Sequence, residues 1–161
     1  MAVFSRACEY GIHAVLFLAA EKGTGRVTIG SLAERYGMSF HYLTTICREL
    51  TVGGVLRSYK GPNGGVALAR PATEISLLDV VKAFNGGGIF NGGAILDRCV
   101  LGLESCSPEL PCPVHSQWAT IGGVMNRMLS GTTFQELADE LNSGEGTLKR
   151  ILLGSARRPK C

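Results

Sequence analysis

Residues 27–71, VTIGSLAERYGMSFHYLTTICRELTVGGVLRSYKGPNGGVALARP, decide the fold of this chain. Thr28 can cap a short helix, which Gly37 would end, and Ser39 can cap a second helix. The two helices are expected at residues 29–36 and 40–51. Two short helices joined by a turn of about three residues that contains Gly are typical of a helix–turn–helix motif.

The residues after the second helix predict a β-hairpin. Two short apolar runs, Val55–Ser58 and Val66–Arg70, flank the glycine-rich tip YKGPNGG at residues 59–65. A helix–turn–helix followed by such a hairpin is a winged helix. We therefore expect a mainly α fold with a small β-hairpin wing, in which the winged helix–turn–helix precedes a long C-terminal dimerisation helix.

The distribution of charge predicts an anionic partner for this segment. Residues 26–70 hold six Lys and Arg and two Glu, a net charge of +4, whereas the whole chain carries only +3. Positive charge concentrated in one short segment favours nucleic acid binding, and the alternative is a basic solvated face.

The outward positions of the second predicted helix hold short polar or planar side chains that can enter a major groove. At the hairpin tip Lys60 can reach the DNA backbone or minor groove, and the glycines let the main chain come close. The alternative is a winged helix used for protein contacts, against which the local charge argues. The expected DNA-binding residues are Thr28, Ser39, His41, Tyr42, Thr44, Thr45, Arg48, Arg57, Lys60, Gly61, Asn63 and Gly64.

A cysteine-rich loop, RCVLGLESCSPELPCPVHSQW, spans Arg98–Trp118. Six residues separate Cys99 from Cys106, five separate Cys106 from Cys112, and His115 follows after two more. Three prolines stiffen the later part, so we expect a shaped loop rather than a helix interior. Thiolates and imidazole are ligands that select zinc, copper(I) or iron–sulfur clusters.

Three kinds of site are compatible with this loop. Zinc ligands usually come in pairs two to four residues apart, and only Cys112 and His115 are that close. An iron–sulfur cluster needs thiolates spread around a larger core, which the longer intervals accommodate. The third alternative is a set of unliganded thiols. A disulfide framework is disfavoured because the thiols of an intracellular chain stay reduced.

Composition bounds the class of protein. The 161 residues are 45% hydrophobic, enough for one domain with a real core. No apolar run approaches the roughly 18 residues of a membrane span. The opening MAVFSRACEYGIHAVLFLAA is a poor signal peptide because Arg6, Glu9 and His13 interrupt it. We therefore expect a cytoplasmic protein.

Further helices are expected on both sides of the winged segment. Residues 5–21 predict an amphipathic helix with Cys8 on its apolar stripe, where a buried thiol is the usual role. Ser76 and Asp79 have the spacing of a capping box, which would open a helix over Leu77–Asn85. Residues 85–93, NGGGIFNGG, are expected to lead flexibly into the cysteine loop.

The segment after the cysteine loop predicts a helix that can dimerise. Its apolar residues recur at offsets of three, four and three, a seam that can bury against an identical helix or within one subunit. Thr133 and Glu136 fit a second capping box. The seam positions are Trp118, Ile121, Met125 and Met128.

We therefore divide the chain into four parts: a winged helix–turn–helix domain (1–84), a linker with the cysteine loop (85–117), a dimerisation helix with a short following helix (118–141), and a disordered tail (142–161) that ends in Cys161.

Over about residues 3–141 the chain resembles the Rrf2 family of bacterial transcription regulators. The resemblance rests on the opening FSRACEYGIHAVLFLA, the segment SLAERYGMSFHYLTTICREL, the wing RSYKGPNGGVALAR and the three-cysteine loop. It implies a homodimer that binds a roughly palindromic operator in double-stranded DNA. It also implies an iron–sulfur cluster held by Cys99, Cys106 and Cys112, although the first interval is six residues where five is commoner.

The resemblance leaves two candidates for the fourth cluster ligand. IscR-like members hold a 2Fe–2S cluster with a histidine placed like His115. NsrR-like members hold a 4Fe–4S cluster and take a ligand from the partner's first helix, at the position of Cys8. We expect His115 and a 2Fe–2S cluster, with Cys8 of the partner subunit and 4Fe–4S as the alternative.

The sequence thus predicts a cluster-dependent repressor or activator without catalytic activity, which senses cluster supply, redox state, oxygen or nitric oxide. Two alternatives remain open: a zinc-stabilised DNA-binding regulator without sensing, and an iron–sulfur electron-transfer or carrier protein. The carrier alternative would leave the basic winged segment unexplained.

Overall fold

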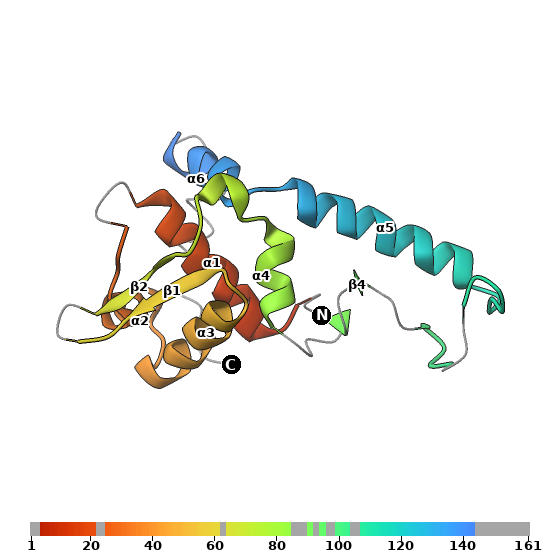
Figure 1. Cartoon of the computed structure of the whole chain (residues 1–161), viewed down its shortest axis with the longest axis horizontal. Helices are drawn as coiled ribbons and strands as arrows, with labels where there is room; N and C mark the ends of the chain where they lie inside the picture. Colours follow the sequence, from red (N-terminus) through yellow and green to blue (C-terminus); the bar gives the residue numbers. More distant parts are fainter. Residues whose placement is uncertain are drawn as a thin grey trace.

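A computed structural model describes residues 4–21, 25–61, 64–84, 90–91, 94–95, 99–103 and 107–143. Figure 1 shows their arrangement, with the helix–turn–helix and its hairpin at one end and a long helix projecting from the other. The elements in chain order are α1 (Arg6–Ala20), α2 (Ile29–Tyr36), α3 (Phe40–Val52), β1 (Leu56–Tyr59), β2 (Gly65–Leu68), a 3₁₀ turn (Ala72–Glu74), α4 (Leu77–Ala83), β3 (Phe90–Asn91), β4 (Ala94–Ile95), α5 (His115–Gly131) and α6 (Phe134–Asn142).

The predicted helix–turn–helix is confirmed together with its caps. The Thr28 hydroxyl accepts the Ser31 amide at the start of α2, and the Ser39 hydroxyl accepts the Tyr42 amide at the start of α3. Gly37 ends α2 in the left-handed conformation, with φ of 60°. Because a side chain is strained at such an angle, glycine suits the turn between the two helices.

The wing is a two-stranded antiparallel sheet in which Leu56 pairs with Leu68 and Tyr59 with Gly65. The strands lie within one to two residues of the predicted runs. The wing also has a feature that the sequence did not indicate. Val27 forms a β-bridge with Val66, with backbone hydrogen bonds of 2.9 and 2.8 Å in the two directions. The segment before α2 therefore lies against the outer side of β2.

The hydrophobic core lies around α1, which runs through the middle of the winged-helix body (Figure 1). Leu16 of α1, Leu43 and Leu50 of α3 and Phe134 of α6 are all at most 2% exposed. Helix α6 packs against α1, so the chain returns to the winged-helix body after α5. The short helix grouped with the dimerisation helix from the sequence thus contributes to this core.

The two capping boxes predicted from the sequence are confirmed, and they lie at the junction between α4 and α6. Ser76 and Asp79 cap α4, and Thr133 and Glu136 cap α6. A β-bridge joins Ser76 to Thr133, so the two helices begin side by side. This pairing holds the C-terminal end of α5 against the body.

Helix α5 begins at His115, three residues before the start expected from the sequence. It extends away from the body (Figure 1). Met125 packs against the core, whereas Ile121, Val124 and Met128 are 49%, 52% and 52% exposed. The predicted seam is therefore split between a residue buried within this chain and residues that face outward.

Several predictions fall on residues outside the described part of the chain: those for Asn63, Cys106 and Cys161, most of the 85–93 segment, and the tail beyond residue 143. Two strands of two residues, β3 and β4, pair where no strand was expected. Within the described residues no helix is long and apolar enough to cross a membrane.

Candidate DNA-binding surface and metal site

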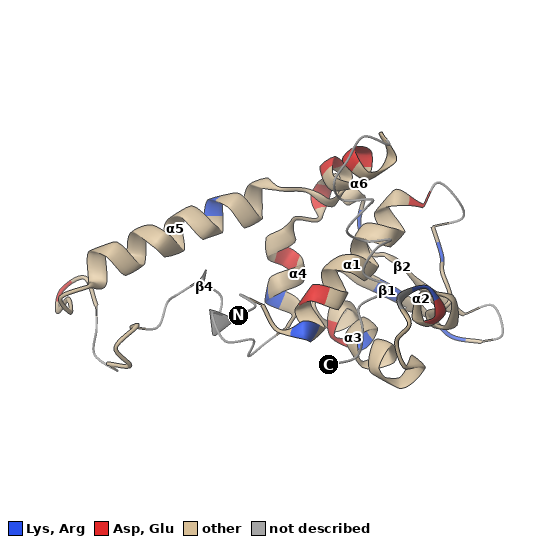
Figure 2. Cartoon of the chain, turned by 180° about the vertical axis from the view of Figure 1, so that it is seen from behind, with Lys and Arg blue, Asp and Glu red and all other residues tan. Residues whose placement is uncertain are grey.

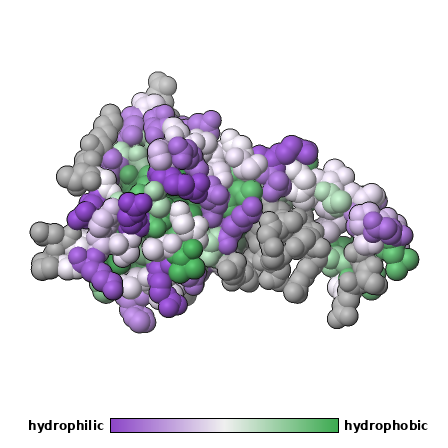
Figure 3. All heavy atoms as spheres, viewed as in Figure 1, coloured by the Kyte–Doolittle hydropathy of each residue, from purple (hydrophilic) through white to green (hydrophobic). Residues whose placement is uncertain are grey.

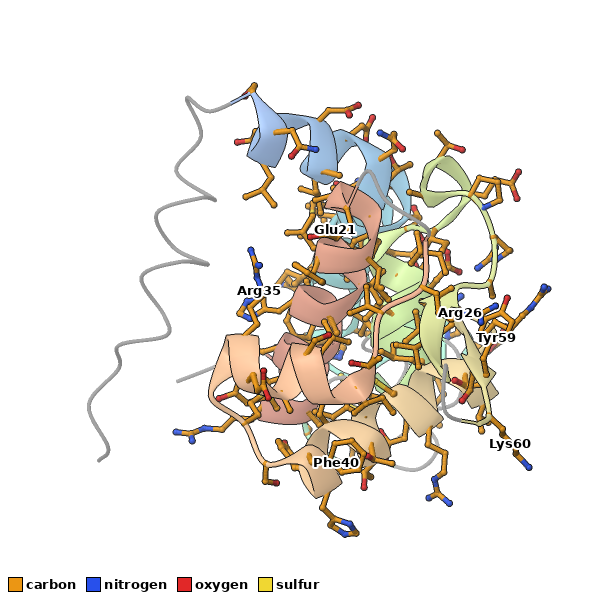
Figure 4. All side chains as sticks on the ribbon, turned by 90° about the vertical axis from the view of Figure 1, so that its left-hand side faces the viewer. Glu21, Arg26, Arg35, Phe40, Tyr59 and Lys60 are labelled. Carbon is orange, nitrogen blue, oxygen red and sulfur yellow. The ribbon has the colours of Figure 1, made fainter. Side chains whose placement is uncertain are left out.

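The outer face of α3 is the part of the helix–turn–helix that faces away from the core. Leu43, Ile46, Cys47 and Leu50 are buried on the inner face, as predicted. His41 and Arg48 are exposed on the outer face. Figure 4 shows the end of α3 that carries Phe40 at the foot of the molecule, opposite α6. The exposed side chains are therefore available to a partner that approaches from that side.

Two of the predicted base-contacting hydroxyls are hydrogen-bonded within α3 itself. The Thr44 hydroxyl donates to the Phe40 carbonyl at 2.8 Å, and the Thr45 hydroxyl donates to the His41 carbonyl at 3.3 Å. Each hydroxyl has one proton, so neither threonine retains a donor for a base. What remains is an acceptor oxygen and a methyl group.

The hydroxyls of Thr28 and Ser39 are engaged as helix caps. Both hydroxyls serve as N-caps and accept backbone amides, and Thr28 also donates to the Ser31 hydroxyl at 3.2 Å. Their structural role is to set the start of α2 and of α3.

The ring of Tyr42 packs against another aromatic ring. It makes an edge-to-face contact with Tyr10 of α1, with centroids 6.2 Å apart and planes at 89°. Tyr10 makes a second contact of this kind with His13. The Tyr42 ring therefore bridges α3 and α1, and 39% of the residue stays exposed.

The hairpin carries the cationic part of the surface. Arg57 of β1 and Lys60 at the tip are exposed, and Figure 4 shows Lys60 pointing away from the body. Gly61, at the tip, has φ of 101°, a conformation that favours glycine. Figure 2 shows acidic residues gathered on α6, at the other end of the body from α3.

Sequence reasoning missed two exposed residues on this surface. Phe40 is 60% exposed at the first position of α3. Its spacing of three from Leu43 is compatible with the inner stripe, so the sequence pattern alone could not place it. Arg26 precedes α2, and its guanidinium lies 3.8 Å from the centroid of the Tyr59 ring. The unpredicted bridge at Val27 produces that contact.

At the other end of the molecule the loop before α5 brings two cysteines together. The Sγ atoms of Cys99 and Cys112 lie 3.6 Å apart. Backbone hydrogen bonds shape the loop on both sides: the Gly102 amide donates to the Cys99 carbonyl, and the His115 amide donates to the Cys112 carbonyl. Among the described cysteines none forms a disulfide.

The separation of these two sulfur atoms fits shared metal coordination. Two thiolates on one tetrahedral metal ion, each at a bond length of about 2.3 Å, lie about 3.8 Å apart. The observed 3.6 Å is close to that value and far from a disulfide bond of about 2.05 Å. His115 is the first residue of α5 and is half-buried beside Cys112 in sequence. The two thiols therefore fit a shared metal ion, but among the described residues no third His, Cys, Asp or Glu joins them in a metal-binding group.

Cys8 lies in a different environment. It is 3% exposed within the core of its own chain. Burial, and to a lesser extent the charge of Glu9, raises the pKa of its thiol to about 12. Burial likewise raises the pKa of Cys47 to about 11. Since a metal ligand must be the thiolate, these two thiols are poor ligands in this conformation.

The loop that carries Cys99 and Cys112 also exposes apolar side chains. Figure 3 shows hydrophobic residues at the tip of the molecule beyond α5. The exposed apolar residues are Val100, Leu101, Leu103 and Leu110.

Hydrogen bonding from the Ser107 side chain lowers the pKa of the Glu109 carboxyl group in the same loop.

One known protein family is similar to this chain over both the winged helix–turn–helix and the cysteine-rich loop. The Rrf2 family, described as an iron-dependent transcriptional regulator, matches residues 4–140. The transcriptional regulator IscR of Photorhabdus laumondii is 28% identical over 131 residues, which cover 81% of this chain and 76% of that protein. The structure of CymR, the global cysteine regulator of Bacillus subtilis, aligns with a TM-score of 0.68 at 26% identity, covering 86% of this chain and 98% of CymR. The structure of T. potens IscR aligns with a TM-score of 0.66 at 25% identity, covering 91% and 93%.

Proposed function

The chain belongs to the Rrf2 family of DNA-binding transcriptional regulators, and we propose that it is a homodimer whose affinity for DNA depends on an iron–sulfur cluster. As a member of that family it is a regulator and not an enzyme. The observation that carries the proposal is the 3.6 Å approach of the Cys99 and Cys112 sulfurs in a loop outside the winged-helix core.

The DNA-binding part of the proposal assigns α3 to the major groove and the hairpin to the phosphate backbone. His41 and Arg48 are the exposed polar residues of α3 that reach base edges or phosphates. Arg57 and Lys60 supply charge from the wing, and Gly61 and Gly64 let its backbone approach the DNA. Two such heads bind a roughly palindromic operator with half-sites about one helical turn apart, or a multiple of it.

The dimer part of the proposal rests on the exposed apolar face of α5. Ile121, Val124 and Met128 lie at offsets of three and four, on one side of the helix, and each is about half exposed. Figure 2 shows α5 almost without charge. An uncharged apolar stripe on a projecting helix is suited to pack against the same stripe of a second copy.

The cluster part of the proposal assigns Cys99, Cys106, Cys112 and His115 as ligands of a 2Fe–2S cluster. Cys106 lies outside the described residues and enters through its place in the motif. His115 is preferred over Cys8 because it belongs to the same loop, whereas the Cys8 thiol is buried in the core of its own chain. When bound, the cluster supplies a redox-sensitive and degradable link between the loop and α5.

A zinc-stabilised regulator without sensing is the second candidate function. It is favoured by the same sulfur separation, because zinc and iron share a thiolate bond length of about 2.3 Å. It differs in its spectrum. Zinc is colourless, whereas a cluster absorbs visible light.

Anaerobic purification, followed by metal and sulfide analysis and Mössbauer spectroscopy, tests the proposal. We expect brown protein that contains iron and acid-labile sulfide, with a spectrum of the 2Fe–2S type. Stoichiometric zinc without sulfide would establish the second candidate instead. Protein that binds neither metal would contradict both.

A further inference from the structure

Phe40 has an exposure that the fold does not explain. It is 60% exposed at the first helical position of α3, directly after the cap residue Ser39. Figure 4 shows it at the foot of the molecule, on the end of α3 that points away from α6. The N-terminal residues of a recognition helix are those that meet base edges in the major groove. An exposed aromatic ring there gains free energy when an apolar surface of the partner covers it.

Thr44 lies one turn further along the same face. Residues four apart on a helix are neighbours, and the Thr44 hydroxyl is turned back to the Phe40 carbonyl at 2.8 Å. Its methyl group is then the part left for an outward contact. The ring of Phe40 and the methyl group of Thr44 together form a small apolar patch at the N-terminal end of α3.

We propose that this patch reads thymine. In the major groove the C5-methyl group of thymine is the apolar feature of the base edges, and Phe and Thr methyl groups are the kinds of group that contact it. The proposal rests on the proposed DNA-binding function and adds a base preference to it. Each half-site contains at least one thymine whose methyl group packs against the ring of Phe40.

Replacing thymine by deoxyuridine tests this directly, because it removes the methyl group and keeps every hydrogen-bonding atom. The operator is first selected from random duplexes with the wild-type protein. Single deoxyuridine substitutions should then weaken wild-type binding about fourfold at one or two positions per half-site, the loss that follows from one buried methyl group. Phe40→Ala should bind the thymine operator more weakly and show no further loss with deoxyuridine.

Variants at Thr44 separate a methyl contact from a hydroxyl contact. Thr44→Val should keep the sensitivity to deoxyuridine, and Thr44→Ser should reduce it. Val52→Ala is the matched control, because Val52 is 84% exposed at the opposite end of α3. Wild-type protein that selects an operator but tolerates deoxyuridine at every position would overturn the thymine inference alone. Wild-type protein that selects no sequence would overturn the proposed function.

A second inference rests on the contact between Arg26 and Tyr59. The guanidinium lies 3.8 Å from the ring centroid, and Figure 4 shows both residues at the same edge of the molecule. The bridge of Val27 with Val66 places Arg26 opposite Ala67, which pairs with Arg57 of β1. Since strand residues alternate between faces, Arg26, Arg57 and Tyr59 share one face of the ribbon.

We infer that Arg26 is a phosphate-binding residue of the wing and that Tyr59 positions it. A guanidinium stacked on a ring keeps its N–H groups in its own plane, directed past the edge of the ring, where a phosphate oxygen can accept them. The stack also reduces the number of conformations that Arg26 loses on binding. This inference also rests on the proposed DNA-binding function.

The salt dependence of operator binding tests the role of Arg26. Arg26→Ala should flatten the slope of log affinity against log salt by about one unit per protomer. Tyr59→Phe should keep the wild-type slope and affinity, whereas Tyr59→Leu should weaken binding. Arg35→Ala is the matched control, because the Arg35 guanidinium lies 4.4 Å from the Phe17 ring, on the other side of the molecule from the wing (Figure 4). An unchanged slope in Arg26→Ala, with intact wild-type binding, would overturn the inference.

Discussion

The Sγ atoms of Cys99 and Cys112 lie 3.6 Å apart although the two residues are 13 positions apart in the sequence. Turns at Cys99–Gly102 and Cys112–His115 shape the loop around the two sulfurs, and the second turn leads directly into α5. The loop therefore brings this pair of thiols together, and the pair lies apart from the hydrophobic core. Loss of a ligand should remove the cluster and leave the winged helix folded.

We expect Cys99→Ala and Cys112→Ala to abolish iron and sulfide binding while the far-ultraviolet circular dichroism stays that of the wild type. Both residues are half-buried in the loop and lie outside the hydrophobic core, so their truncation opens no core cavity. Iron and sulfide assays on anaerobically purified variants check this. Wild-type iron content in both variants would show that this loop is not the ligand site.

Substitution of each candidate fourth ligand by alanine should show whether His115 or Cys8 binds the cluster. His115→Ala should lose or alter the visible spectrum of the cluster, whereas Cys8→Ala should keep the spectrum and lose about 0.5–3 kcal/mol of stability, because it removes a buried side chain. A spectrum altered only in Cys8→Ala would favour a ligand shared between subunits.

The alkylation rates of the cysteines in the cluster-free protein should separate the buried thiols from the thiols of the loop. At pH 8 the Cys8 and Cys47 thiols, with pKa values raised to about 12 and about 11, should react far more slowly than Cys99 and Cys112. Their thiolates form in the folded protein only as the pH rises toward those values. Since an unfolded thiol ionises near its model value of 9.0, burial of the neutral thiols destabilises the folded state progressively above that pH. Mass spectrometry of the labelled peptides measures the rates.

Charge placed on the exposed face of α5 should dissociate the proposed dimer. Ile121→Glu would bury a carboxylate against a second copy, so analytical ultracentrifugation should report a monomer at micromolar concentration. Ala119→Glu is the control, because Ala119 is exposed two residues away, on roughly the opposite side of the helix. A variant at Ile121 that stays dimeric would place the interface elsewhere.

Two phenylalanine substitutions should differ sharply in their effect on stability. Phe134→Ala should lower the free energy of unfolding by about 3–5 kcal/mol, because the side chain is fully buried where α6 packs on α1. Phe40→Ala should change it by less than about 0.5 kcal/mol, because most of that side chain is already in solvent. Chemical denaturation measures both. Equal effects would contradict the packing of α6 into the core.

The same Gly→Ala change should have opposite effects at two positions of the winged helix. At Gly65 a Cβ would collide with the Val27 carbonyl, so the substitution should break the bridge to β2 and weaken DNA binding. At Gly30, inside α2, a Cβ meets nothing closer than the Thr28 hydroxyl at 3.9 Å. There the substitution should stabilise the protein by about 0.5–1 kcal/mol. Hydrogen exchange at the Val27 amide should rise only in Gly65→Ala.

Local signals in the sequence were sufficient for most of the fold. Thr28, Ser39, Ser76 and Thr133 cap the helices that they were expected to cap, because a cap depends on residues three apart. The bridge between Val27 and Val66 was not predictable in this way. The bridge joins residues far apart in the chain. Neither Val27 nor Val66 lies in a sequence pattern that indicates which partner it pairs with.

The sequence predicted which residue types the candidate sites contain, but it predicted little of how their side chains are arranged. The spacing of Cys99, Cys112 and His115 predicts a ligand loop, and the apolar stripe of the first helix correctly predicted a buried Cys8. The spacing could not show that the two sulfurs meet. On α3 the sequence showed that Thr44 faces outward. It could not show that the hydroxyl donates back to the helix, because that choice depends on the side-chain rotamer.

The central claim is that DNA affinity depends on the cluster held by the loop. Its most direct test is an anaerobic anisotropy titration of the selected operator with cluster-loaded wild-type protein, repeated after a chelator has removed the iron. We expect the two dissociation constants to differ by about 5-fold to 150-fold, the usual range for coupling between two sites. Superimposable binding curves for the loaded and the cluster-free protein would contradict the claim.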